Sequence, residues 1–274
     1  MGPPASLGAA QSREKTMAKK AKRVLVLSDF HAGHEVGLTP PEWNIGMPGD
    51  QMVQYRAEMW SRFEKALKMV GVPDVLVVNG DMVDGRGERS GSVELLHLDR
   101  GIQVDMASEI INRAKAKSII LTRGTDYHVG IAESWEDRIA ENVGAERIGD
   151  VINADINGLV MNFRHHLGNS QTPVGRAGPL AREATWNALW NVRQGFPLAD
   201  VIVRSHVHHH TYTGGPGWLA LTTPALQGYG TRYGERRMSG IIDWGIVVFD
   251  ITSKENYTWK AITFPFPYPQ TTQL

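Results

Sequence analysis

Short runs rich in β-branched residues recur through the chain, and between several of them lie stretches of helical length with apolar periodicity. The expected strands are residues 24–28, 75–79, 119–122, 160–164 and 201–204. The expected helices are residues 52–70, 93–114, 135–143 and 180–192. This alternation of strand and helix predicts an α/β fold whose core strands are buried on both faces.

The last part of the chain has a different pattern. Residues 218–223, 241–251 and 257–264 are strand-like runs that lie closer together, with turn residues between them. Close spacing without helices is typical of antiparallel pairing. The sequence therefore predicts an antiparallel second sheet near the end of the chain.

Length and composition fit one globular domain. The 274 residues are 42% hydrophobic and 21% charged, which is enough apolar material for a large core. Residues 1–21 mix Gly, Pro, Ala, Ser and Lys without apolar periodicity, and we expect a flexible N-terminal tail there. A single domain is predicted over residues 22–274.

Charge and residue usage narrow the class of function. Lys plus Arg and Asp plus Glu both number 29, so net charge does not indicate nucleic-acid binding, although a local basic groove would escape this count. The absence of cysteine excludes disulfides and thiolate metal sites. No apolar run approaches about 18 residues and no secretory signal is present, which favours a cytoplasmic protein without membrane association.

Metal-binding side chains follow directly after each of the five expected strands. In chain order they are Asp29 and His31; Asp81 and Asp84; Thr125, Asp126 and His128; His165 and His166; His206 and His208. Functional side chains in an open α/β sheet gather where loops leave the carboxyl ends of strands. We therefore expect these side chains to converge on one edge.

Mixed carboxylate and imidazole ligands suit two hydrolytic metal ions. One carboxylate must hold the ions about 3.5 to 4 Å apart, and Asp81, between a glycine and an apolar pair, is the predicted bridge. The first ion would be completed by Asp29, His31 and His208. The second would be completed by His165, His206 and an oxygen of Asp126 or Thr125.

Such a centre predicts the hydrolysis of a phosphate ester. A water or hydroxide between the ions would be the nucleophile. His128 would donate a proton to the leaving group, and Asp84 would orient its ring by accepting the other N–H. His128 and Asp84 are the predicted catalytic pair.

The motif order resembles the calcineurin-like metallophosphoesterase family, with its series D-x-H, G-D-x-x-D, G-N-H-D/E, a single His after a strand, and G-H-x-H. The resemblance spans residues 24 to about 251, and residues 29–31 and 80–84 match outright. Ser205 replaces the leading glycine of the last motif, and Thr125 stands where the family has asparagine.

For two of the predicted metal-ligand positions, the sequence offers two candidate residues each. Thr125 occupies the aligned asparagine position, whereas Asp126 is preferred because of its charge. His165 is preferred over His166 because the family ligand is the first histidine at the strand end.

The chain also resembles phage- and prophage-encoded members of this family. The similarity is carried by the sequences of residues 27–34 and 37–41, the Arg123-Gly124-Thr125 turn and the paired histidines His165 and His166. The resemblance implies a four-layer α/β/β/α sandwich of two mixed sheets. It also implies that the protein functions in the cytoplasm of a bacterial or phage-infected host cell. It also implies two divalent metal ions, with manganese preferred over iron, zinc, nickel or magnesium.

Four arginines flank the motifs and could clamp a substrate phosphate: Arg86, Arg123, Arg176 and Arg232. The leading hypothesis is a dinuclear metal-dependent phosphoesterase acting on phosphomonoesters or phosphodiesters. The alternatives are a nuclease within the family, or a weakly active or inactive metal-binding assembly protein that kept the fold. Neither the physiological substrate nor the oligomeric state follows from the sequence.

Overall fold

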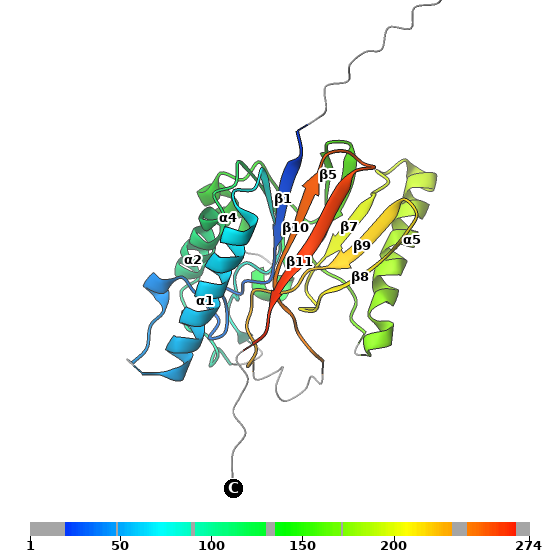
Figure 1. The fold of residues 1–274 in the computed structure, drawn as a ribbon. Helices are drawn as coiled ribbons and strands as arrows, with labels where there is room; N and C mark the ends of the chain where they lie inside the picture. The colour runs from blue at the N-terminus through cyan, green and yellow to red at the C-terminus, as the bar shows by residue number, and fades with distance from the viewer. Residues whose placement is uncertain are drawn as a thin grey trace, which may run out of the picture.

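The computed structural model describes residues 20–47, 49–88, 91–129, 135–170, 172–231 and 240–266. Most of the expected N-terminal tail therefore lies outside the described residues, as does Arg232. Two mixed sheets lie face to face at the centre of the molecule, with helices on both outer sides (Figure 1).

The first sheet has six strands in the order β11-β10-β1-β2-β3-β4. Their bounds are β1 (Lys22–Leu27), β2 (Val75–Asn79), β3 (Ser118–Thr122), β4 (Arg147–Gly149), β10 (Trp244–Ile251) and β11 (Tyr257–Phe264). Strands β1 to β4 run parallel, whereas β10 pairs antiparallel with β1 and with β11. The carboxyl ends of the parallel strands consequently meet at one edge of this sheet.

The second sheet has five strands in the order β5-β6-β7-β9-β8. Their bounds are β5 (Ile152–Ile156), β6 (Leu159–Phe163), β7 (Val201–Arg204), β8 (Thr211–Gly215) and β9 (Trp218–Thr222). Strands β6, β7 and β9 run parallel, and β5 and β8 close the two edges in the antiparallel sense.

Helices cover the outer face of each sheet and complete four layers. The helices α1 (Gln51–Val70), α2 (Arg100–Arg113) and α4 (Trp135–Val143) cover the first sheet, and α5 (Ala177–Gln194) covers the second (Figure 1). Shorter helical turns are η1 (Pro41–Trp43), α3 (Asp126–Val129) and η3 (Pro173–Gly175). The predicted four-layer α/β/β/α sandwich of two mixed sheets is confirmed.

Alternation along the strands builds separate cores. In β1, Leu25 and Leu27 pack toward the helices, and Val24 and Val26 pack toward the second sheet. Successive strand residues point to opposite faces, so a strand between two layers must be apolar throughout. Each such side chain contributes about 1.5 to 3 kcal/mol when fully buried, and this burial holds the strand ends in place.

The assignment of the late strands to one antiparallel second sheet is wrong. Strands β10 and β11 belong to the first sheet, and β9 pairs parallel with β7 in the second. The expected helix over 93–114 begins only at Arg100, where Asp99 caps it by accepting bonds from Gly101 N and Ile102 N. Strands β4, β5 and β8 were not predicted, and β4 spans only three residues.

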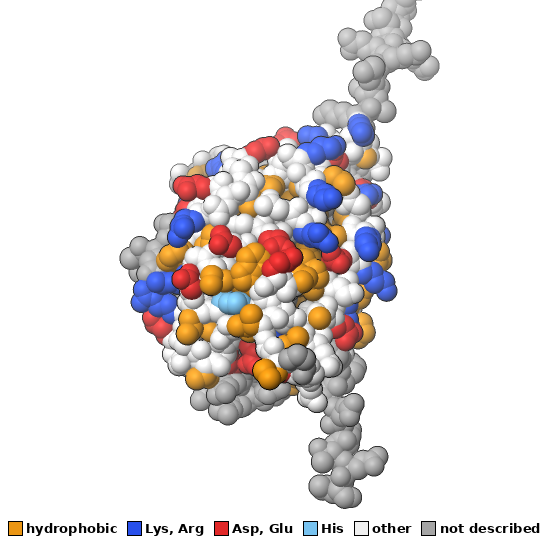
Figure 2. Space-filling view, turned by 90° about the vertical axis from the view of Figure 1, so that its left-hand side faces the viewer, with side chains coloured by type: hydrophobic (Ala, Val, Ile, Leu, Met, Phe, Trp, Pro, Cys, Tyr) orange, Lys and Arg blue, Asp and Glu red, His pale blue; other side chains and the backbone are white. Residues whose placement is uncertain are grey.

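The outer surface of the helices that cover the first sheet carries mixed charge (Figure 2). On the face formed by α1, α2 and α4, acidic and basic side chains are interspersed (Figure 2). Within the described part of the chain, no helix combines the length and the apolar character required to cross a bilayer.

Candidate metal centre

The predicted site residues come from loops of both sheets. Loops after β1, β2 and β3 carry residues of the first sheet, and loops after β6 and β7 carry those of the second. The expectation of a single sheet edge is therefore corrected, because the two sheets face each other and their carboxyl ends together enclose the site. Three overlapping clusters of possible ligands form there.

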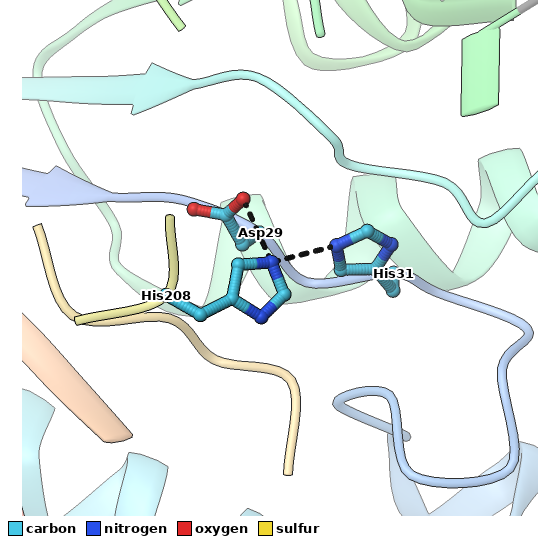
Figure 3. Close-up of side chains that lie close together, drawn as sticks. All are labelled: Asp29, His31 and His208. Carbon is cyan, nitrogen blue, oxygen red and sulfur yellow. Dashed lines mark hydrogen bonds and ion pairs between the residues drawn. The ribbon is translucent and has the colours of Figure 1, made fainter. Parts of the chain in front are cut away.

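The first cluster consists of Asp29, His31 and His208 (Figure 3). His208 Nε2 lies 3.2 Å from Asp29 Oδ1 and 3.4 Å from His31 Nε2. His208 reaches these two side chains from the loop after β7, across the boundary between the sheets. The cluster matches the ligand set predicted for the first ion.

The second cluster consists of Asp81, His165 and His206. His165 Nε2 lies 3.0 Å from Asp81 Oδ2 and 3.9 Å from Asp29 Oδ1, so this ring lies between the two carboxylates. Its Nδ1 lies 2.7 Å from the carbonyl oxygen of Asn79. A carbonyl can only accept, so Nδ1 donates and Nε2 is the atom that faces the site.

The third cluster consists of His31, Asp81 and His128. Asp81 thus belongs to two clusters, and His31 links the first cluster to the third. Position in two clusters is what a shared carboxylate requires. The bridging role of Asp81 stays a prediction that this arrangement supports.

Several buried ligand atoms have no hydrogen-bond partner among the described residues. They are both carboxylate oxygens of Asp29 and Nε2 of His165, in side chains that are almost fully buried. His208 Nε2 is near Asp29 but does not meet hydrogen-bond geometry. Buried polar atoms are almost always paired, and a buried carboxylate is costly unless a cation or donor compensates it. These residues therefore fit a bound divalent cation.

The backbone at the same residues is strained. Asp29, His31, Asp81, His206 and His208 all have φ between 47° and 73°, the left-handed region that non-glycine residues seldom adopt. Each such residue costs on the order of 1 to 3 kcal/mol and persists where its surroundings enforce it. The strain points all five side chains into one volume instead of along the strands.

Two motif glycines allow the loops to approach each other. A Cβ on Gly80 would lie 2.5 Å from Cγ of His165, and a Cβ on Gly124 would lie 2.1 Å from Oδ1 of Asp81. Neither distance can be accommodated, because the neighbours are themselves buried. These glycines are therefore required for the packing of the site.

Electrostatics differ among the ligand positions. Burial by itself raises the pKa of Asp29, but the interactions of its carboxylate with His208 and His165 together outweigh burial and lower that pKa to about 2. Burial lowers the pKa of His31 and the pKa of His206 to about 4 each. At His165, the negative charge of Asp81 outweighs burial and raises the pKa to about 10. A cation placed there would have to displace that proton.

Asp84 lies beside two histidines. Its Oδ1 is 3.1 Å from His31 Nδ1 and 3.4 Å from His128 Nδ1, and its backbone carbonyl lies 2.9 Å from the same His128 atom. Burial opposes the charge of Asp84, yet hydrogen bonds from His128 and His31 hold its pKa well below the usual range. Despite burial, the charges of Asp81 and Asp84 raise the pKa of His128 to about 9. The predicted orientation of His128 by Asp84 agrees with this geometry.

A buried glutamate that the sequence reasoning missed joins two of the loops. Glu136, on α4, accepts a 3.0 Å bond from Met82 N and a 2.7 Å bond from Gly124 N. It is 1% exposed, and burial raises its pKa to about 7. No local sequence signal distinguishes it from other helix glutamates. Glu136 fixes the loop of Asp81 against the loop of Thr125.

A buried hydroxyl network lies beneath the loops. Thr223 Oγ1 lies 2.7 Å from both Ser28 Oγ and Ser205 Oγ, and Asn79 donates to Ser205 Oγ. Ser205 directly precedes His206, so the network also supports the start of the loop that carries His206 and His208. The network ties the end of β1 to the ends of β7 and β9.

The two residues of each open ligand alternative lie in different surroundings. Thr125 contacts Asp81 through its backbone N at 2.7 Å and its Oγ1 at 3.1 Å, whereas Asp126 is exposed and belongs to none of the clusters. Asp126 starts α3 at an exposed position, so this geometry gives no support to the preference for Asp126, which stays a prediction. His165 is buried in a cluster, whereas His166 is exposed.

The arginines expected to bind substrate have other contacts. Arg123 pairs with Asp137 and Asp150, and Arg86 lies 3.8 Å from Glu88. Arg176 donates to the carbonyl of Ile241, and its buried Nε has no partner among the described residues. Arg232 lies outside the described residues. A substrate role is least supported for Arg123, whose ion pairs occupy it.

No protein-family model and no curated protein matches this chain. Solved structures do match, at low sequence identity. An archaeal phosphodiesterase is 16% identical, with a TM-score of 0.44, and the match covers 88% of this chain and 99% of that one. The Zn²⁺ complex of Vps29 from Entamoeba histolytica is 12% identical, with a TM-score of 0.44 and coverages of 89% and 99%. A predicted phosphoesterase from Streptococcus pneumoniae is 11% identical, with a TM-score of 0.39 and coverages of 89% and 100%. Similarity this distant does not identify a reaction.

Proposed function

We propose that this chain is a dinuclear metal-dependent phosphoesterase of the calcineurin-like type. The observation that carries the proposal is the convergence of Asp29, His31, Asp81, His165, His206 and His208, with buried ligand atoms that have no hydrogen-bond partner among the described residues. Carboxylates and imidazoles together are the donor set of hydrolytic divalent metals such as manganese, iron and zinc. The proposed substrate is a phosphomonoester or a phosphodiester. Since nucleic acids are phosphodiesters, the proposal includes a nuclease.

The protein would hold two cations in adjoining positions. Asp29, His31 and His208 would hold one, His165 and His206 the other, and Asp81 would serve both. When bound, the ions would neutralise phosphoryl charge and make water a stronger nucleophile near neutral pH. Thr125 would keep the Asp81 carboxylate in place by donating to it.

His128 is the proposed proton donor to the leaving oxygen. Its Nδ1 donates to the carbonyl oxygen of Asp84, which fixes the ring and leaves Nε2 to carry the exchangeable proton. The ring is 18% exposed at its side chain, so a leaving group can reach it from solvent. Asp84 is the proposed positioning residue of this pair.

The proposal is tested by metal-dependent turnover. Purified protein is stripped with chelator, reloaded with each divalent metal, and assayed with bis-p-nitrophenyl phosphate and p-nitrophenyl phosphate, while metal content is measured in parallel. We expect turnover that requires metal and is lost in Asp81→Ala and His208→Ala but retained in Asp105→Asn, a control at an exposed position on α2. Two bound ions without turnover on a broad phosphoester panel would favour a metal-binding protein without catalysis and refute the enzyme.

A further inference from the structure

A cavity lies on the outer side of the second sheet, away from the candidate metal centre. It has a volume of about 260 Å³ and opens between α5, the loop after it, and the strands β5, β6 and β7. None of the predicted metal ligands lines it. The cavity therefore requires its own explanation, independent of the proposed function.

The strand side of the cavity is cationic. Arg204 is 4% exposed and donates to Glu183 through Nε at 3.1 Å and Nη2 at 2.9 Å, and Arg164 donates to the same carboxylate. Burial lowers the pKa of Arg204 to about 10, which still leaves it charged at neutral pH. Two guanidinium groups facing one carboxylate leave one net positive charge on the lining.

Arg164 has donor capacity that the protein does not use. Its Nε is buried and has no acceptor among the described residues, while 41% of the side chain is exposed. A guanidinium is most often satisfied by a carboxylate or a phosphate, which match its planar fork. The unpaired Nε on a positive lining indicates an acidic ligand.

The helix side of the cavity is aromatic. Trp186, Trp190 and Phe196 are each about half exposed, and the rings of Trp190 and Phe196 stack at 5.3 Å with an angle of 12°. Large apolar rings left open to solvent on a cavity wall are suited to stacking on a planar ligand. The floor adds the carboxamides of Asn153 and Asn162, which hydrogen-bond each other at 2.8 Å.

We propose that this cavity binds a planar aromatic anion of about mononucleotide size, with its ring against Trp186 and Trp190 and its acidic group at Arg164. The volume lies just below the range of about 300 to 1,000 Å³ found for small-molecule pockets, which favours a compact ligand over an oligonucleotide. The same chemistry is offered by a nucleoside monophosphate and by an aromatic carboxylate, and the acidic group distinguishes them.

The test uses 5′-AMP and indole-3-acetate as probes, with adenosine and inorganic phosphate as fragments that carry only one half of the recognition. Chelator is present so that neither hydrolysis nor phosphate binding at the metal centre contributes. Calorimetry and tryptophan fluorescence should show one saturable site per chain for at least one probe. Each fragment should bind at least ten-fold more weakly than that probe, and the tighter probe identifies the acidic group.

Variants locate the site. Trp186→Ala and Arg164→Met should each weaken binding of the tighter probe at least ten-fold, whereas Val192→Ala, an exposed α5 residue outside the lining, should leave it unchanged. Trp186→Ala removes a half-exposed ring, so it tests the site even if Arg164→Met fails to fold. The proposal is overturned if neither probe binds, if inorganic phosphate binds as tightly as the better probe, or if Trp186→Ala leaves affinity intact. The proposal is also overturned if the protein binds neither probe but self-associates, and if Trp186→Ala abolishes that self-association. Such a result would show that the cavity is part of a protein interface.

Discussion

The ends of β6 and β7 carry opposite chemistry on the two sides of the second sheet. His165 and His206 lie among buried carboxylates of the first sheet, where the pocket suits cations. Arg164 and Arg204, one and two residues earlier, contact Glu183 on the outer side, where the lining suits anions. Strand residues alternate between faces, so the adjacent Arg164 and His165 can serve unrelated sites, and the left-handed backbone at His206 turns that residue away from the strand path of Arg204. The comparison predicts that the two sides respond separately to substitution.

The largest effect should follow the loss of the shared carboxylate. Asp81→Asn keeps the shape of the side chain but removes its charge, so we expect turnover to fall by about 10³-fold or more, equivalent to about 4 kcal/mol of transition-state stabilisation. Metal content should fall from two ions per chain, as measured by elemental analysis. Asp105→Asn, at an exposed position on α2, is the control and should be neutral. Loss of probe binding in the outer cavity of Asp81→Asn would contradict the separation.

The packing of α5 on the outer face of the second sheet can be destabilised separately from the metal centre at Leu180, the one described residue of α5 that is fully buried. Leu180→Ala should lower the free energy of unfolding by about 2 to 5 kcal/mol, because it leaves a cavity under the helix. Urea denaturation measures this, and metal affinity of the folded variant should change less than two-fold. The matched control is Val192→Ala, which is 84% exposed and should stay within about 0.5 kcal/mol of the parent. Equal losses in both variants would show that α5 is not anchored at Leu180.

The metal affinity of the candidate centre can be lowered without substituting a predicted metal ligand. Glu136→Gln places an amide N–H against one of the backbone donors, Met82 N or Gly124 N. An unsatisfied buried donor costs about 1 to 3 kcal/mol, and loss of such a supporting contact lowers metal affinity about 10- to 100-fold. Metal titration and denaturation measure the two effects. Glu141→Gln, exposed on the same helix, should change neither, and an unchanged metal affinity in Glu136→Gln would mean that the loops hold their positions without it.

The sequence predicts well what is encoded locally. Asp29, His31 and Asp81 follow their strands within a few residues, so a strand prediction also places their side chains at a strand end. Pairing between distant segments is not local: β10 joins β1 across more than two hundred residues, and Glu136 bonds Met82 from 54 residues away. No periodicity marks such partners before the chain has folded. The sheet to which the late strands belong and the role of Glu136 were missed for this reason.

Thr125 contacts Asp81 whereas Asp126 is exposed, and the smallest predicted effect tests which of the two supports the site. Thr125→Val keeps the volume but removes the hydroxyl that lies 3.1 Å from Asp81 Oδ1, while the backbone N–H bond of residue 125 remains. We expect a loss of about 1 kcal/mol, or about five-fold in metal affinity or turnover. Thr125→Ser keeps the hydroxyl and should restore most of it. Asp126→Asn should change either quantity less than two-fold, since Asp126 is exposed and belongs to no cluster. A larger effect from Asp126→Asn than from Thr125→Val would return the ligand role to the carboxylate and require the start of α3 to unwind when metal binds.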